Sequence, residues 1–171
     1  MKILGAQDAT RLKAAEGWLE LGNHIEANEE LEKITPSRRA HPDVLQVRYE
    51  IYAKAKRWEP CLDIASAIVK LDPERSFGWI RRAKALHGLN RTKEALEALL
   101  PAMRRFPDEL TIRYDLACYE CVLGNIAKAK RRLKEAYRIA QKLDSFDKWR
   151  KAAFLEPDLL PMRDVYGAYD L

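Results

Sequence analysis

The most reactive side chains at a suggestive spacing are two cysteines and a histidine. Cys118 and Cys121 are three residues apart, so on a helix both thiols lie on one side, and His87 holds the place 34 residues before Cys121. Sulfur and imidazole suit zinc, but a structural zinc site takes four ligands and this pattern supplies three. A pair in the middle of a helix also lacks the N-terminal dipole that lowers thiol pKa values in redox motifs. We therefore expect no metal and no cofactor, with both thiols acting as small packing groups.

Sequence motifs of the common catalytic sites are absent. The seven glycines are scattered, so there is no glycine-rich phosphate loop, and neither Gly-x-Ser-x-Gly nor His-Glu-x-x-His occurs. We expect a protein without enzymatic activity.

The dominant pattern is a 34-residue repeat in four blocks, which open at Asp8, Pro42, Ser76 and Leu110. A period of this length is typical of solenoid proteins. Small or aliphatic side chains recur at spacings that place them on one face of a helix, so each block predicts two packed helices. The eighth place holds Ala15, Tyr49, Ala83 and Ala117, the twentieth Ala27, Cys61, Ala95 and Ala129, the twenty-fourth Leu31, Ala65, Leu99 and Leu133, and the twenty-seventh Ile34, Ile68, Ala102 and Ala136.

This pattern resembles the tetratricopeptide repeat of bacterial proteins, with small residues at the eighth and twentieth places and a proline near the end, here Pro73 and Pro107. The resemblance implies an all-α fold, a right-handed superhelix (α-α solenoid) of antiparallel helix pairs forming a single domain over 1–171. Its repeats are 8–41, 42–75, 76–109 and 110–143. The fourth place, large and apolar in the family, holds Arg11 and Arg113 in the outer blocks, which therefore depart from the pattern.

The residues after the last repeat, 144–171, are expected to cap the solenoid, because terminal repeats need a polar outer face. An amphipathic helix is predicted at Phe146–Leu155, with Phe146, Trp149, Ala153 and Phe154 on or near one face. Residues 157–163 read PDLxPxR, which is similar to the ending of many bacterial proteins of this family. The tail over 165–171 is expected to be either disordered or a ligand for a groove.

The resemblance also implies a binding surface, because in this family the second, fifth, ninth and twelfth places of each block line a concave groove that holds protein partners. Several of these places carry large apolar side chains, and contiguous exposed apolar surface marks binding sites. The alternative is that neighbouring helices cover them. We expect the groove to comprise Leu12, Glu16, Leu19, Gln46, Glu50, Phe77, Ile80, Arg81, Lys84, His87, Tyr114, Cys118 and Cys121.

Charge is unevenly distributed along a chain whose net charge is +5. Residues 1–35 carry a net charge of −3, whereas residues 76–142 hold fifteen Lys or Arg against seven Asp or Glu, a net charge of +8. The densest run, 128–134, indicates either a solvated helix face or a surface for an acidic partner. Nucleic acid is disfavoured, because the run lacks interleaved aromatic residues and matches no nucleic-acid module.

Together these patterns predict a non-enzymatic protein–protein interaction scaffold, an adaptor that binds a peptide or helix of a partner in its groove, as a monomer or weak homodimer. No apolar run reaches the roughly 18 residues of a membrane span, and no secretory segment opens the chain, so we expect a cytoplasmic protein. The alternatives are a small chaperone of a secretion system, or an accessory subunit that docks an acidic partner or nucleoprotein through repeats three and four.

Overall fold

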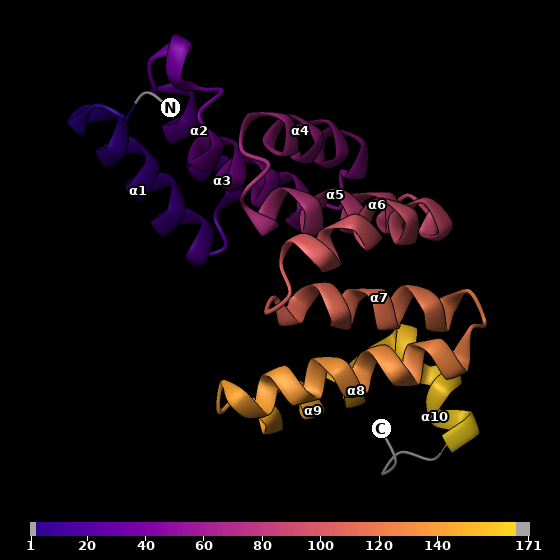
Figure 1. The fold of residues 1–171 in the computed structure, drawn as a ribbon. Helices are drawn as coiled ribbons and strands as arrows, with labels where there is room; N and C mark the ends of the chain where they lie inside the picture. The colour runs from indigo at the N-terminus through magenta and orange to yellow at the C-terminus, as the bar shows by residue number, and fades with distance from the viewer. Residues whose placement is uncertain (1–2, 167–171) are drawn as a thin grey trace. The chain divides into compact units, whose positions relative to one another are not determined.

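The computed structural model describes residues 3–166, and every regular element in that range is helical (Figure 1). None of these helices is both long and apolar enough to span a membrane. The elements are α1 (Ala6–Glu20), α2 (His24–Glu32), η1 (Pro36–Arg38), α3 (Pro42–Lys54), α4 (Trp58–Leu71), α5 (Ser76–Gly88), α6 (Thr92–Arg105), α7 (Leu110–Val122), α8 (Ile126–Lys142), α9 (Phe146–Leu155), η2 (Pro157–Leu159) and α10 (Leu160–Tyr166).

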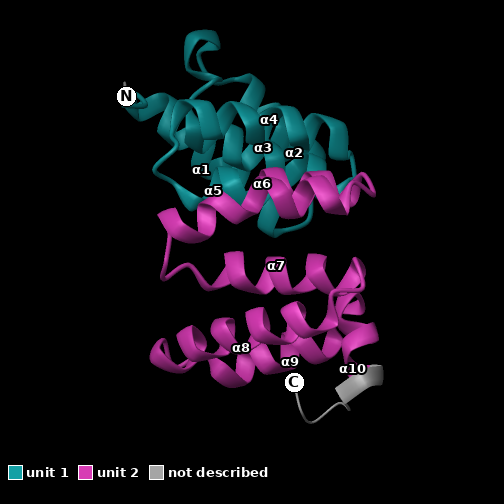
Figure 2. Cartoon of the chain, turned by 45° about the vertical axis from the view of Figure 1, so that its right-hand side comes forward, with its two compact units in different colours: residues 1–81 teal, residues 82–171 magenta. Residues whose placement is uncertain are grey.

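The chain divides into two compact units, unit 1 over 1–81 and unit 2 over 82–171, with the division inside α5 (Figure 2). In unit 1, α1 packs against α2 and α3 against α4; in unit 2, α7 packs against both α6 and α8. Three helices, α3, α5 and α7, begin at the opening residue of a predicted block. Pro42 suits the first position of α3, because its ring presets a helical φ and the missing N–H has no partner there in any helix.

The turns inside the helix pairs repeat with the same period as the sequence. Gly22, Lys56, Asn90 and Gly124 are 34 residues apart, and all four have positive φ, from 53° to 81°. The N–H of the next residue then donates to the carbonyl five residues back, for example Asn23 to Trp18 at 2.9 Å. This left-handed cap satisfies carbonyls at the end of each first helix. Lys56, an exception by residue type, adopts the same conformation as its counterparts.

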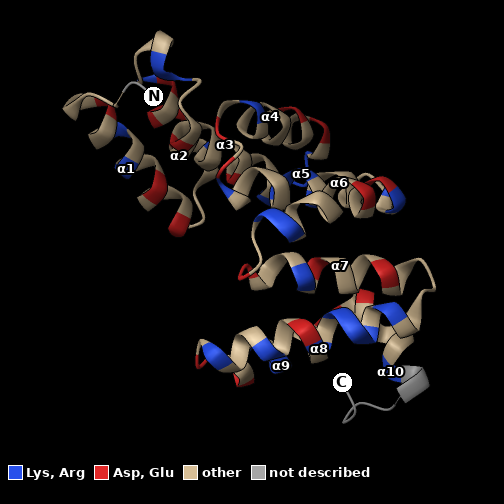
Figure 3. Ribbon diagram, viewed as in Figure 1, with Lys and Arg blue, Asp and Glu red and all other residues tan. Residues whose placement is uncertain are grey.

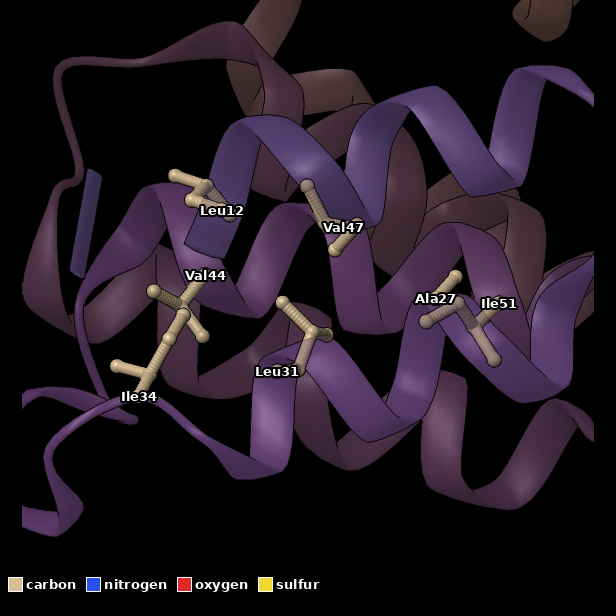
Figure 4. Packing of buried hydrophobic residues seen from close by; sticks show 8 residues of the cluster. Leu12, Ala27, Leu31, Ile34, Val44, Val47 and Ile51 are labelled. Carbon is tan, nitrogen blue, oxygen red and sulfur yellow. The ribbon is translucent and has the colours of Figure 1, made fainter. Parts of the chain in front are cut away.

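The four repeated columns of small and aliphatic residues form the core, as predicted. All sixteen side chains are between 0% and 1% exposed. In unit 1 the packed cluster joins α1, α2 and α3, where Leu12 and Leu31 lie with Val44 and Val47 (Figure 4). Small residues here allow close helix approach, and the larger ones fill the space beside them.

The arginines at the fourth place of the outer blocks form ion pairs. Arg11 Nη1 lies 3.0 Å from Glu30 Oε2 on α2, and Arg113 Nε lies 4.0 Å from Glu135 Oε2 on α8. Each pair joins the first helix of a block to the second. In these two blocks an ion pair thus takes the place of the apolar contact that the repeat pattern leads one to expect.

The helix predicted at Phe146–Leu155 is confirmed as α9. Phe146 packs edge-on against Tyr137, Trp149 packs against Tyr114, and Ala153 is fully buried. The prediction was wrong for Phe154, which is 51% exposed and lies under the Arg163 guanidinium. Phe154 directly follows the buried Ala153 and is turned about 100° away from it around the helix, so the apolar face is narrower than the spacing suggested.

Candidate partner-binding surfaces

The two cysteines and the histidine do not form a reactive site. Burial raises the pKa of Cys118 well above its usual value and also raises that of Cys121, so both thiols stay neutral. His87 uses both ring nitrogens elsewhere: Nε2 lies 3.0 Å from Asp158 Oδ2, and Nδ1 lies 2.9 Å from Thr92 Oγ1. Among the described residues no three His, Cys, Asp or Glu side chains are grouped as metal ligands would be.

We call the predicted groove positions, the second, fifth, ninth and twelfth places of each block, the groove stripe. In unit 2 the C-terminal segment, η2 and α10, covers part of this stripe. Both η2 and α10 contact α7, the helix that carries Tyr114, Cys118 and Cys121. The ring of Tyr114 packs against Trp149 with centroids 4.9 Å apart, and burial is the main cause that raises the Tyr114 pKa. Leu159 of η2 is itself fully buried. The expected exposure of the α7 stripe is therefore wrong, because residues after the last repeat occupy that face.

Two apolar stripe residues of unit 1 are also buried rather than exposed. Leu12 is 8% and Ile80 7% exposed, whereas Leu19 and Phe77 are half-buried. Leu12 belongs to the core cluster of α1, α2 and α3. For these residues the alternative in which neighbouring helices cover the stripe holds, since spacing places a residue on a face but does not show what packs there.

Two acidic stripe residues of unit 1, Asp43 and Glu50, pair with arginines beside the stripe. Arg81 Nη2 lies 2.7 Å from Glu50 Oε1, and its guanidinium sits 5.0 Å from the centre of the Phe77 ring. Arg75 Nη1 lies 2.6 Å from Asp43 Oδ1, while its Nη2 donates to Gln46 Oε1 at 3.3 Å. These pairs neutralise Glu50 and Asp43, so neither carboxylate presents an isolated charge.

A pocket of about 530 Å³ lies on α1 and the start of α3, and we call it the α1–α3 pocket. Four of its lining residues are places of the groove stripe: Ala9, Leu12 and Glu16 from block one and Asp43 from block two. The other lining residues are Ile3, Leu4, Lys13 and His41. Glu16 is exposed and makes no ion pair or side-chain hydrogen bond within the described residues. This surface therefore offers an apolar hollow with an uncommitted carboxylate at its rim.

A second hollow, of about 450 Å³, lies on α8 in unit 2, and we call it the α8 basic face. Its lining is Ala127, Lys130, Arg131, Lys134, Glu135 and Arg138. Figure 3 shows Lys and Arg recurring along this helix. The opposite side of α8 carries Ala129, Leu133, Ala136 and Ala140, all buried. The run of charge noted in the sequence thus lies partly on an outward face of the unit.

Comparison with solved structures shows a similar fold in other proteins. A MamA double mutant from strain RS-1 matches with a TM-score of 0.70 and 17% identity, covering 81% of this chain and 78% of that chain. MamA from Desulfovibrio magneticus RS-1, residue 41 to the end, matches with a TM-score of 0.67 and 15% identity, covering 85% of this chain and 90% of that chain. TTC0263, a thermophilic TPR protein from Thermus thermophilus, matches with a TM-score of 0.67 and 19% identity, covering 96% of this chain and 100% of that chain.

Sequence comparison adds no closer assignment, because no protein-family model and no curated protein matches the chain. At identities below 20% the structural matches show a shared fold rather than a shared function. The matched length and the four helix pairs agree with the sequence pattern. The fold of this chain is that of the tetratricopeptide repeat proteins.

Proposed function

We propose that the chain is a non-enzymatic interaction scaffold that binds a peptide or helix of a partner protein, with an anchoring side chain of that partner in the α1–α3 pocket. The observation that carries the proposal is a hollow of about 530 Å³ on the stripe of unit 1. Large, partly apolar hollows with a few convergent polar groups are the usual sites of ligand binding.

The lining indicates the chemistry of the anchor. Ile3, Leu4, Ala9 and Leu12 offer apolar surface, which suits an aliphatic or aromatic side chain, since removing apolar surface from water drives association. Glu16 lies at the rim without a partner in the described part of the chain, so a lysine or arginine of the ligand would gain a charge-assisted hydrogen bond there.

The remaining predicted stripe residues have a supporting role in this proposal. The Arg81 and Glu50 pair, with the Phe77 ring beneath the guanidinium, presents a largely neutral polar surface. A ligand can lie along such a surface without desolvating an isolated charge, which would be costly. The three buried thiols suit a reducing compartment such as the cytoplasm.

The test starts from peptides selected out of a displayed random library against the full chain. Ala9→Arg fills the pocket, and we expect it to weaken the selected peptides at least about tenfold. Gln7→Arg is the matched control, because Gln7 is an exposed α1 residue outside the pocket lining and the change adds the same charge. Fluorescence anisotropy measures each dissociation constant.

Equal binding by the Ala9→Arg variant, with an unchanged thermal midpoint, would place the ligand elsewhere and overturn the proposed site. Glu16→Gln tests the rim carboxylate separately. It should weaken peptides that carry a basic residue beside the anchor and leave the others unaffected.

A further inference from the structure

Three basic side chains of α8 have no acidic partner among the described residues of unit 2. Glu135 is the one acidic residue in α8. Its Oε2 lies 3.2 Å from Arg132 Nη1, and it also pairs with Arg113 on α7. Arg131, Lys134 and Arg138 form no ion pair and no side-chain hydrogen bond with the described residues. They are three and four residues apart, so they lie along one stripe of the helix. Like charges at this spacing repel, and Glu135, the acidic residue in the same lining, is already engaged by Arg132 and Arg113.

The α8 basic face extends along about three turns of the helix. The small side chain of Ala127 lies at one end, and longer basic side chains border the hollow of about 450 Å³. Between positions 127 and 138 the helix rises roughly 16 Å, at about 1.5 Å per residue. An extended peptide covers that length with roughly five residues.

The chemistry of the lining selects among anionic ligands. Arginine forks bind carboxylates in a bidentate manner, and lysine adds a mobile point charge. None of the lining residues is aromatic, so bases of a single-stranded nucleic acid have no ring to stack on. Apart from Ala127 the lining lacks apolar side chains, which disfavours an apolar helix as the ligand.

We propose that the α8 basic face is a docking surface for an acidic protein segment, an extended run of about five residues rich in aspartate or glutamate. Arg131, Lys134 and Arg138 are its principal contacts. This surface lies in unit 2 and is independent of the α1–α3 pocket, so either proposal can fail without the other.

The experiment uses the full chain and a fluorescent peptide of roughly six glutamates, at about 0.1 M and about 1 M ionic strength, where the Debye lengths are about 10 Å and 3 Å. We expect Arg131→Glu with Lys134→Glu to weaken binding at the lower ionic strength at least about tenfold. The control is Lys148→Glu with Lys151→Glu on α9, two exposed lysines whose reversal changes net charge equally. It should change affinity less than about threefold.

Two further probes make the result specific. A peptide with glutamine in place of each glutamate should not bind, and an oligothymidylate of equal charge should bind more weakly than the glutamate peptide. If the two double variants lost equal peptide affinity, the loss would be explained by the change in net charge alone. If the oligonucleotide bound more tightly than the glutamate peptide, the face would be assigned to nucleic acid. Either result overturns the proposal. Circular dichroism of both double variants checks that the helices remain folded.

Discussion

Gly78 sits where α5 crosses α4 in unit 1, and its replacement by alanine should destabilise the chain. A Cβ at this position would lie 2.9 Å from Ile68 Cγ2, 3.0 Å from the Val69 backbone nitrogen and 3.1 Å from Val69 Cγ2. Ordinary contacts of such atoms begin at about 3.4 Å, and the Val69 backbone, lying within α4, cannot easily give way. The two helices would therefore have to separate by several tenths of an ångström.

Two effects of opposite sign determine how much Gly78→Ala changes the free energy of unfolding. Alanine is favoured over glycine within a helix by about 0.8–1 kcal/mol, and Gly78 is the third residue of α5, where this gain is smaller. Overpacking a close helix contact costs about 1–3 kcal/mol. We expect Gly78→Ala to lower the free energy of unfolding by about 1–2 kcal/mol.

Gly17 provides a matched control in α1, because a Cβ there would have no neighbour within 4 Å. Gly17→Ala should therefore raise the free energy of unfolding by up to about 1 kcal/mol. Urea denaturation followed by circular dichroism compares the two variants with the parent chain. If Gly78→Ala were as stable as Gly17→Ala, α4 and α5 would not be in the close contact at Gly78 that this prediction requires.

Three other predictions concern a turn, a carboxylate and the thiols. Lys56→Gly should stabilise the chain by about 1 kcal/mol in urea denaturation, because a non-glycine residue at φ 53° is strained; no change would mean the turn relaxes. Hydrogen bonds from Lys33 and then Arg11 lower the pKa of Glu30. The stabilisation by ionised Glu30 is fully present above the unfolded pKa of about 4.3 and is lost as pH falls through the lower folded pKa. The thermal midpoints of the parent and Glu30→Gln should therefore differ at neutral pH and converge as the pH falls below the unfolded pKa. Burial raises the pKa of all three cysteines, that of Cys61 to about 11, so a disulfide reagent at about pH 8 should label them only upon unfolding; rapid labelling of the native chain would contradict their burial.

Much of the fold follows from the sequence because it rests on short-range periodicity. Side chains three and four residues apart share a helix face, and a recurrence at 34 residues shows that the same helix pair is built again. Ala15 and Ala27 could be assigned to a helix contact in this way, and both are fully buried. The left-handed residue in each turn obeys the same period, which explains why even Lys56 adopts it.

The candidate surfaces were harder to predict, because exposure depends on contacts between residues far apart in the chain. Spacing placed Tyr114 on the groove stripe, but the ring of Trp149, 35 residues later, covers it. Likewise, the sequence lists Glu50 and Arg81 as separate groove residues and does not show that they form an ion pair at 2.7 Å. The repeat pattern does not show which side chains from distant parts of the chain contact one another.

The helix pairs, their turns and the residues at their contacts follow from the sequence, since they depend on backbone preferences and on spacings within one repeat. The surface that remains available to a partner depends instead on the folded arrangement of the chain. That arrangement buried Leu12 in the core, left Glu16 unpaired at the rim of a pocket within the described residues, and turned Arg131 outward from α8. The physical reason is that burial and ion pairing are set by through-space packing, and a repeat period specifies that packing for the recurring core positions alone.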